Sequence, residues 1–117
     1  MGLRDRVKKF TSSTEEIDQA RLQGRFAGGD VCPIAEAPLR ERMRISGEVM
    51  SMRIVPRAGS PSLEVTVADG TGKAVAVFTG RRKIAGIQPG RGLVLEGVAG
   101  KGSGRIQLLN PAYTLLG

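Results

Sequence analysis

The sequence of 117 residues contains no histidine, and its acidic residues form no catalytic pattern. Without histidine, a hydrolase would need paired carboxylates, an activated serine or a metal cluster. The acids of the C-terminal part are scattered along it, and no phosphate-binding loop of the Walker type is present. These acids are Glu41, Glu48, Glu64, Asp69 and Glu96. We therefore expect a protein that is not an enzyme, with no catalytic residue, no metal ligand and no cofactor.

The sequence also lacks cysteine pairs and long apolar runs. Its single cysteine, Cys32, excludes an intrachain disulfide framework and agrees with a reducing compartment. Cys32 precedes Pro33 and has no base nearby in the sequence, which favours a structural thiol over a nucleophile. No apolar run approaches the roughly 20 residues that cross a bilayer, and the N-terminus lacks the apolar segment of a signal peptide. We expect a cytoplasmic protein with no membrane association.

Glycine, by contrast, is abundant: the chain has 17 glycines, a load typical of a small all-β domain with many turns. The clearest pattern lies at residues 63–68, where apolar and polar residues alternate with the period of a half-buried strand. Asp69-Gly70-Thr71-Gly72 follows, and residues 73–79 continue in extended character. Because Asp-Gly supplies the positive φ angles of a tight turn, this stretch predicts a β-hairpin.

A long strand is predicted ahead of this hairpin, from about residue 42 to residue 55. Its inward-facing set is Met43, Ile45, Gly47 and Val49. Met52 and Ile54 are also apolar, although they lie in the opposite phase. A β-bulge at residues 50–51 would flip the phase and bend the strand, so that it pairs in both halves of a closed barrel. Residues 56–61, with a proline at each end, are predicted to form the turn into the next strand.

Two further strands are predicted at residues 92–99 and 105–109, with a closing segment at residues 112–116. The connection before them is too short for a crossover helix, but one helical turn would let Ile84 and Ile87 plug the barrel end. A meander of three strands followed by two more fits a small Greek-key barrel, so the predicted class is mainly β.

Two helical segments are predicted before the barrel. Residues 1–10 place three apolar side chains at helical spacing among basic ones, which predicts a short amphipathic segment that docks on the domain or frays. These side chains are Leu3, Val7 and Phe10. A separate helix is predicted over residues 14–26, because Ser13 and Glu16 have the spacing of a capping box.

This second helix should end at Gly28-Gly29, and its apolar stripe of Leu22 and Phe26 is narrow. It is therefore expected to pack loosely, on the barrel or on a protein partner. Residues 30–38 are interpreted as an extended linker. The predicted division is an N-terminal helical arm and linker at residues 1–38 and a barrel at residues 39–117.

The order of the glycines and apolar residues resembles a known pattern. Its residues are Ile45-x-Gly47-x-Val49, Asp69-Gly70-Thr71-Gly72, Phe78, Pro89-Gly90, Leu95-x-Gly97 and Gln107-x-x-Asn110-Pro111-x-Tyr113. They are similar to an OB-fold of the tRNA-anticodon-binding type, to the wedge domain of RecG-type helicases and to small stand-alone OB-fold proteins of actinobacteria. The resemblance covers about residues 33–116. It implies a five-stranded OB-fold Greek-key barrel preceded by a short N-terminal α-helix, and nucleic-acid binding without helicase activity, because motor motifs are absent.

The charge distribution agrees with that implication. Residues 1–38 carry six basic and six acidic side chains, whereas residues 39–117 carry twelve basic and five acidic ones, so the net charge of +7 belongs to the predicted barrel. A basic domain attracts polyanions, because each neutralised phosphate releases condensed counterions. The alternative is that the charge serves solubility alone.

OB-folds bind nucleic acid on the outer face of their second and third strands and in the two flanking loops, between strands 1 and 2 and between strands 4 and 5. The first loop region offers Arg53 and Arg57, and the second offers Lys101 and Arg105. A further basic run follows the third strand and consists of Arg81, Arg82 and Lys83. As phosphate contacts these seven residues would contribute affinity without sequence information; the alternative is ordinary solubilising charge.

Aromatic side chains for stacking on bases are scarce. The four in the chain are Phe10, Phe26, Phe78 and Tyr113. Phe78 is predicted to lie in the core and Tyr113 to close the barrel. The sequence leaves open which phase of the third strand is buried. The alternatives are Ala74, Ala76 and Phe78, or Val75 and Val77. Since each stacked base contributes about 1–3 kcal/mol, affinity should be weak, salt-sensitive and mainly electrostatic.

The leading hypothesis is a non-enzymatic module that binds nucleic acid, as single-stranded or junction DNA or as RNA, mainly through its phosphates. The competing hypothesis is a protein-interaction adaptor, whose barrel or N-terminal helix docks on a larger nucleic-acid-processing complex. Scarcity of aromatic residues and an outward apolar face at Val75 and Val77 motivate the second hypothesis.

Overall fold

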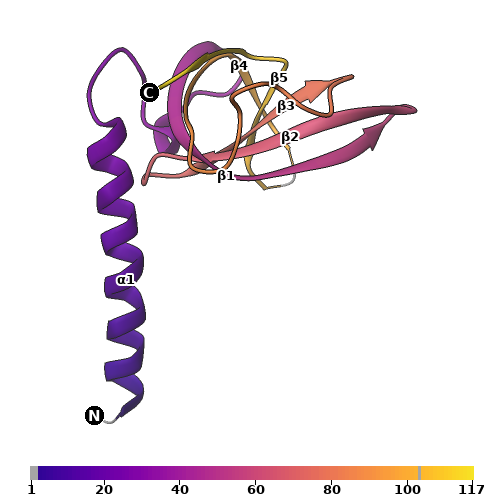
Figure 1. Cartoon of the computed structure of the whole chain (residues 1–117). Coiled ribbons are helices and arrows are strands. Elements are labelled where there is room, and N and C mark those ends of the chain that lie inside the picture. The colour runs from indigo at the N-terminus through magenta and orange to yellow at the C-terminus, as the bar shows by residue number, and fades with distance from the viewer. Residues whose placement is uncertain (1–2, 103) are drawn as a thin grey trace.

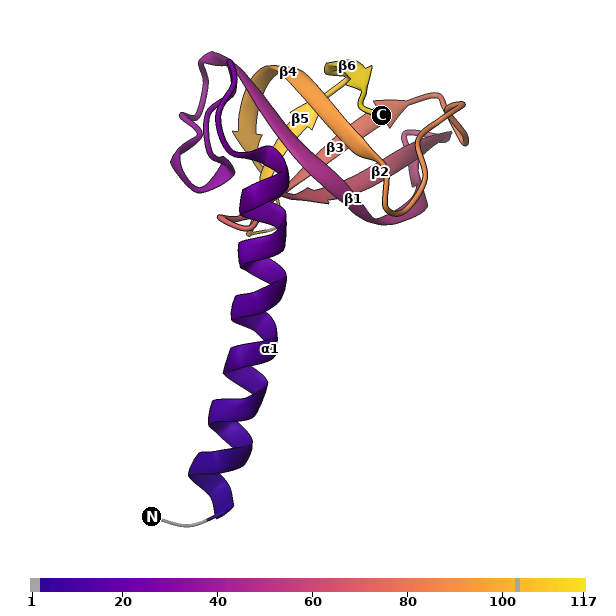
Figure 2. The ribbon, with the colours of Figure 1, turned by 60° about the vertical axis from the view of Figure 1, so that its left-hand side comes forward.

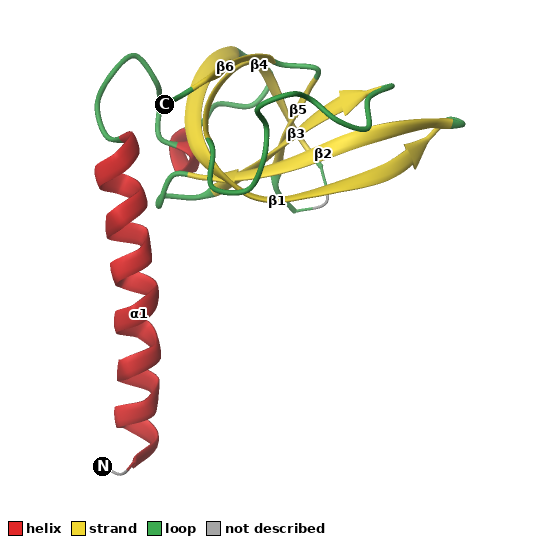
Figure 3. Cartoon of the chain, in the orientation of Figure 1, coloured by secondary structure: helices red, strands yellow, loops and turns green. Residues whose placement is uncertain are grey.

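The computed structural model describes residues 3–102 and 104–117, with side chains described from Thr14 onward. It shows a strand-rich unit from which one long helix extends (Figures 1 and 3). The helical elements are α1 (Leu3–Phe26) and the 3-10 helix η1 (Ile34–Glu36). The strands are β1 (Arg42–Arg57), β2 (Ser60–Ala68), β3 (Lys73–Thr79), β4 (Gly92–Lys101), β5 (Ile106–Leu109) and β6 (Ala112–Leu115).

Five strands pair in a closed ring. β1 pairs with β2, β2 with β3, β3 with β5, β5 with β4, and β4 returns to β1. Of these five pairings between described strands, the one between β3 and β5 is parallel and the others are antiparallel. β6 adds to β4 beside this ring, so the closing segment predicted from the sequence is a sixth strand. The predicted five-stranded barrel is confirmed.

A β-bulge in β1 lets that strand serve both sides of the ring. Val49 pairs with Val67 and Ser51 pairs with Thr66, so Met50 has no partner on β2 and lies exposed. The N-terminal half of β1 pairs with β4 and the C-terminal half with β2. The bulge predicted at residues 50–51 is therefore confirmed, and it bends β1 around the barrel.

The barrel interior holds one hydrophobic core. Its most enclosed members are Ile45, Val49, Leu63, Val65, Val67, Ala74, Ala76, Leu93, Leu95 and Leu108. Phe78 belongs to the same core, so the phase of β3 that faces inward is the one with Ala74 and Ala76. Ile84 and Ile87 also pack into the core, as predicted, although from a turn rather than a helix.

The segment expected to be an extended linker is folded against the barrel. η1 interrupts it, and Ile34 is buried in the barrel core. Cys32 is half-buried beside that core, and burial raises the pKa of its thiol. This agrees with a structural thiol.

The turn between β1 and β2 is tighter than predicted. The strands continue to Arg57 and resume at Ser60, which leaves Ala58 and Gly59 as a two-residue loop. Both have positive φ angles, of 47° and 81°, as the favoured hairpin turns require. Pro56 and Pro61 were interpreted as turn residues, but they face each other across the end of the hairpin, where a missing N–H is tolerated.

The prediction of a helix start at Ser13 is wrong. α1 is continuous from Leu3 to Phe26, and nothing in residues 11–14 breaks a helix, because serine and threonine are tolerated in helix interiors. The side chains of Leu3, Val7 and Phe10 lie outside the described residues. The helix does end near Gly28, whose φ is 80°. Most of α1 projects away from the barrel (Figure 2), and no helix among the described residues is long and apolar enough to span a membrane.

Among the described side chains of α1, those of its C-terminal part dock on the barrel. Leu22 and Phe26 are buried in a small cluster with Ala68, whereas Ile17, nearer the projecting end, is 70% exposed. At Gly70 the β2–β3 turn approaches the helix so closely that a Cβ would collide with the backbone of α1, and the φ of 89° also requires glycine. The docking therefore rests on a small apolar contact and a close backbone approach.

A buried carboxylate on β1 reinforces this contact. Glu48 accepts hydrogen bonds from Arg21, at 3.0 and 3.2 Å, and from Arg25, at 2.5 Å. Its side chain is only 12% exposed, so both charge-assisted contacts lie partly out of water. The hydrogen bonds from Arg21, more than the one from Arg25, hold the pKa of Glu48 below its ordinary value of 4.5.

Replacing Glu48 with glutamine should weaken the docking of α1. We expect Glu48→Gln to lower the free energy of unfolding by about 1–2 kcal/mol at neutral pH, because Arg21 and Arg25 then share one neutral amide oxygen in place of a charged carboxylate. Since the folded pKa is depressed, the contribution of Glu48 is complete above its ordinary pKa and disappears as the pH falls through the folded value. Urea unfolding of the wild-type protein and of Glu48→Gln, at neutral and at acidic pH, measures the difference in the free energy of unfolding.

Glu96→Gln is the matched control, because Glu96 contacts Arg42 and Arg44 at the surface and is itself more exposed. It should cost less than about 0.5 kcal/mol. Equal losses for the two variants, or a loss at Glu48 that persists in acid, would contradict this account.

Candidate nucleic-acid interface

The outer face of the sheet presents two rows of side chains that cross four strands. In the first row Thr66 pairs with Ser51 and with Val75, which in turn faces Gln107. In the second row the neighbours across the strands are Arg53, Glu64, Val77 and Leu109. These residues alternate with the core residues of each strand, so the register of the barrel decides which side chains share this face.

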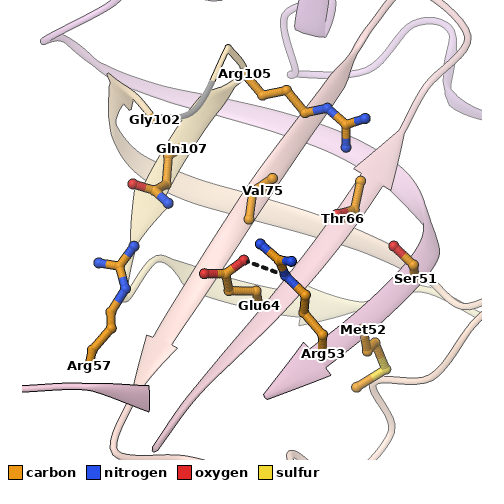
Figure 4. Close-up of a pocket in the computed structure, with 10 residues that line it drawn as sticks. All are labelled: Ser51, Met52, Arg53, Arg57, Glu64, Thr66, Val75, Gly102, Arg105 and Gln107. Carbon is orange, nitrogen blue, oxygen red and sulfur yellow. Dashed lines mark hydrogen bonds and ion pairs between the residues drawn. The ribbon is translucent and has the colours of Figure 1, made fainter. Parts of the chain in front are cut away.

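A groove of about 470 Å³ opens over these rows (Figure 4). Its lining comes from β1, β2, β3 and β5 and from the loop between β4 and β5. The residues are Ser51, Met52, Arg53, Arg57, Glu64, Thr66, Val75, Gly102, Arg105 and Gln107. Their polar side chains outnumber the apolar ones, and no aromatic ring is among them. The groove is therefore suited to polar and charged ligands rather than to apolar ones.

Three of the seven predicted contact residues meet at this groove. Arg53 and Arg57 reach it from β1, and Arg105 reaches it from the loop before β5 (Figure 4). Arg57 and Arg105 are exposed, and neither forms an ion pair within the described part of the chain. Two guanidinium groups are thus free to bind an anion at the mouth of the groove.

Arg53 is engaged with the groove floor. Its Nε donates a hydrogen bond to Glu64 Oε1 at 3.1 Å. The side chain of Arg53 is 75% exposed, whereas that of Glu64 is 12% exposed, so the carboxylate lies at the bottom of the groove and the guanidinium above it. The charges of Arg53 and Glu64 cancel each other, so the net positive charge of the groove comes from Arg57 and Arg105.

The other four predicted residues do not line the groove. Lys101 ends β4 next to Gly102, which does line it, and Lys101 is exposed. Arg81, Arg82 and Lys83 follow β3 and are exposed. Arg82 lies instead over a shallower hollow beside the tip of the β1–β2 hairpin, with Ile54 and Pro61.

The described aromatic side chains lie away from this face. Phe78 is in the core, and Tyr113 packs edge-on against it with ring centroids 5.8 Å apart. Val77 is in the outward phase but fully buried, and Val75 is half-buried. The outward apolar patch expected at Val75 and Val77 is therefore not open; the exposed apolar residue of the second row is Leu109.

Sequence reasoning overlooked the polar floor of the groove. Glu64, Thr66 and Gln107 line it together, from β2 and β5. The alternation at residues 63–68 already placed Glu64 and Thr66 on one face of a strand. Nothing local indicates that Gln107 lies beside them, because the parallel pairing of β3 and β5 brings it there.

No protein-family model and no curated protein sequence matches this chain. Solved structures do match it. The replication factor A related protein of Methanobacterium thermoautotrophicum is 19% identical, with a TM-score of 0.56, over 74% of this chain and 90% of that one. The fold is an OB-fold.

Two further structures are similar to the chain. The Stn1–Ten1 complex of S. pombe matches with 18% identity and a TM-score of 0.52, and a replication protein A heterotrimer bound to single-stranded DNA matches with 15% identity and a TM-score of 0.50. Each match covers 70% of this chain and 62% of the other. At such identities the likeness concerns the fold.

Because Arg57 and Arg105 are exposed, their removal should leave the OB-fold intact. We expect Arg57→Ala and Arg105→Ala to change the free energy of unfolding by less than about 0.5 kcal/mol. Arg53→Ala should cost about 0.5–1 kcal/mol, because Glu64 is left half-buried without its donor. Adding Glu64→Gln to Arg53→Ala should recover part of that loss. Urea unfolding checks all four, and a large loss for Arg57 or Arg105 would show that these side chains are structural.

Proposed function

We propose that this protein is a non-enzymatic OB-fold module that binds single-stranded or junction nucleic acid, mainly through the phosphates. The observation that carries the proposal is the groove on the outer face of the barrel, where Arg53, Arg57 and Arg105 surround a polar floor. It lies where OB-folds bind oligonucleotides, over the second and third strands and between the two flanking loops.

The charge of the barrel supports this. Residues 39–117 carry twelve basic and five acidic side chains, and several of the acids are already paired. One of the similar structures holds single-stranded DNA, and another is the Stn1–Ten1 complex. By analogy with the structure that holds single-stranded DNA, we propose that this chain binds single-stranded nucleic acid. Lys101 and the run at residues 81–83 would extend the phosphate path beyond the groove.

Three finer predictions belong to the same proposal. The likeness to the wedge domain of RecG-type helicases and to stand-alone actinobacterial proteins would favour junction DNA among the possible ligands. A cytoplasmic location also belongs to the proposal, and the lone Cys32 agrees with it. The division at residue 38 would leave a helical arm outside the barrel, although Ile34 packs into the barrel core.

Binding should depend strongly on salt and on the groove arginines. For a single strand, the slope of log K against log salt is about −0.7 per phosphate contact, so the contacts at Arg57 and Arg105 predict a slope of about −1.4 from the groove. Arg57→Ala and Arg105→Ala should each reduce the slope by about 0.7 and the affinity about fivefold at about 0.1 M salt. Fluorescence anisotropy with labelled single-stranded DNA and RNA measures both quantities.

Arg42→Ala is the matched control. Arg42 is an exposed arginine on β1 that pairs with Glu96 and does not line the groove. It should leave the slope and the affinity nearly unchanged. No binding at micromolar protein in low salt, or binding that salt does not weaken, would overturn the proposed function.

A protein-interaction adaptor is the second candidate. The observation in its favour is α1, most of which projects from the barrel and exposes Ile17 (Figure 2). Such a helix is suited to docking in a groove of a partner. A partner retained from nuclease-treated lysate by the wild-type chain and lost by Ile17→Glu would support the adaptor, whereas loss of every partner after nuclease treatment would argue against it.

A further inference from the structure

The floor of the groove carries a carboxylate where phosphate binding alone would disfavour one. Glu64 lies at the bottom of an arginine-lined groove, and its side chain is 12% exposed. An anionic group at this place repels a phosphate that approaches the floor. A bound strand would therefore place its phosphates at Arg57 and Arg105 and its bases toward the floor.

The floor offers bases hydrogen bonds rather than stacking. Thr66, Gln107 and Glu64 supply polar groups, and none of the described residues that line the groove carries an aromatic ring. Bases inserted edge-on meet these groups with their Watson–Crick edges, as in other proteins that read unstacked bases. The groove is thus equipped to distinguish bases by their pattern of donors and acceptors.

Glu64 presents an acceptor that is already oriented. Its Oε1 accepts one hydrogen bond from Arg53, at 3.1 Å, and its Oε2 receives none from the described residues. An ionised carboxylate has about four acceptor sites, so both oxygens can still accept. The hydrogen bond from Arg53 holds the carboxylate in place.

We propose that Glu64 makes this groove selective for guanine, by accepting the N1–H and the N2–H of one base with its two carboxylate oxygens. Guanine is the base whose Watson–Crick edge places two donors side by side. Cytosine and adenine each offer one amino group next to an acceptor. Thymine and uracil flank one donor with two carbonyl oxygens, which a carboxylate repels. The O6 of guanine remains for a donor such as the amide of Gln107.

This inference rests on the proposed function and specifies its ligand: a single strand that contains guanine. The expected order of affinity is guanine first, cytosine and adenine next, and thymine or uracil last. A bidentate contact discriminates by at least about fivefold.

Anisotropy titrations with labelled oligonucleotides of about ten nucleotides test it. Alternating thymine–guanine, thymine–cytosine and thymine–adenine strands are compared with oligothymidine, in lithium salt so that guanines do not form quadruplexes. The thymine–guanine strand should bind at least about fivefold more tightly than oligothymidine. Replacing its guanines with inosine, which lacks the 2-amino group, should remove most of the difference.

Glu64→Gln should remove the preference for guanine, and oligothymidine should bind more tightly, since a negative charge has left the groove. Glu96→Gln, the same change on an acid outside the groove, should preserve the preference. The inosine comparison uses the wild-type chain, so it decides the matter even if Glu64→Gln does not fold.

The outcomes separate the two proposals. Equal binding of all strands, with Glu64→Gln strengthening each of them alike, would overturn the guanine contact and leave phosphate binding intact. A guanine preference that survives both Glu64→Gln and inosine would also overturn it. Absence of binding to every strand at low salt would overturn the proposed function itself.

Discussion

The bulge at Met50 is the constraint on which the barrel and its groove both depend. Side chains of a strand alternate between faces, so one extra residue moves every later side chain to the opposite face. Val49 faces the core ahead of the bulge. If β1 kept its regular alternation through Met50, Arg53 and Arg57 would share the inward phase of Val49, where a charge without a partner is not tolerated. The bulge that lets β1 close the ring therefore also turns Arg53 and Arg57 toward solvent.

Much of this could be predicted from short-range pattern. The alternation at residues 63–68 and the Asp-Gly turn predicted the hairpin, and the broken parity of β1 predicted the bulge. Two predictions were wrong because the same short sequence pattern is compatible with more than one local structure. The capping pattern at Ser13 is compatible with a helix interior, and the prolines at residues 56 and 61 are compatible with strand ends. Local signals record what a residue permits, and tertiary pairing selects among the permitted states.

The site was less accessible to prediction than the fold. Arg53, Arg57 and Arg105 were predicted from the loops of the OB pattern, and the structure brings them to one groove. Glu64 and Gln107 line the same groove because β3 pairs with β2 on one side and with β5 on the other. No sequence period encodes a register between strands that distant in the chain. The role of Glu64 therefore follows from the residues that strand pairing places beside it, and these are not evident from the sequence.

The central claim is that nucleic acid lies in the groove on the outer face of β2 and β3. Backbone amide shifts of the 15N-labelled protein, followed by NMR during titration with a single-stranded oligonucleotide at low salt, test it most directly. The account predicts the largest shifts at Ser51, Thr66, Val75, Gly102 and Gln107, with small ones along α1. Shifts confined to α1 or to the β4–β6 side of the barrel would contradict it.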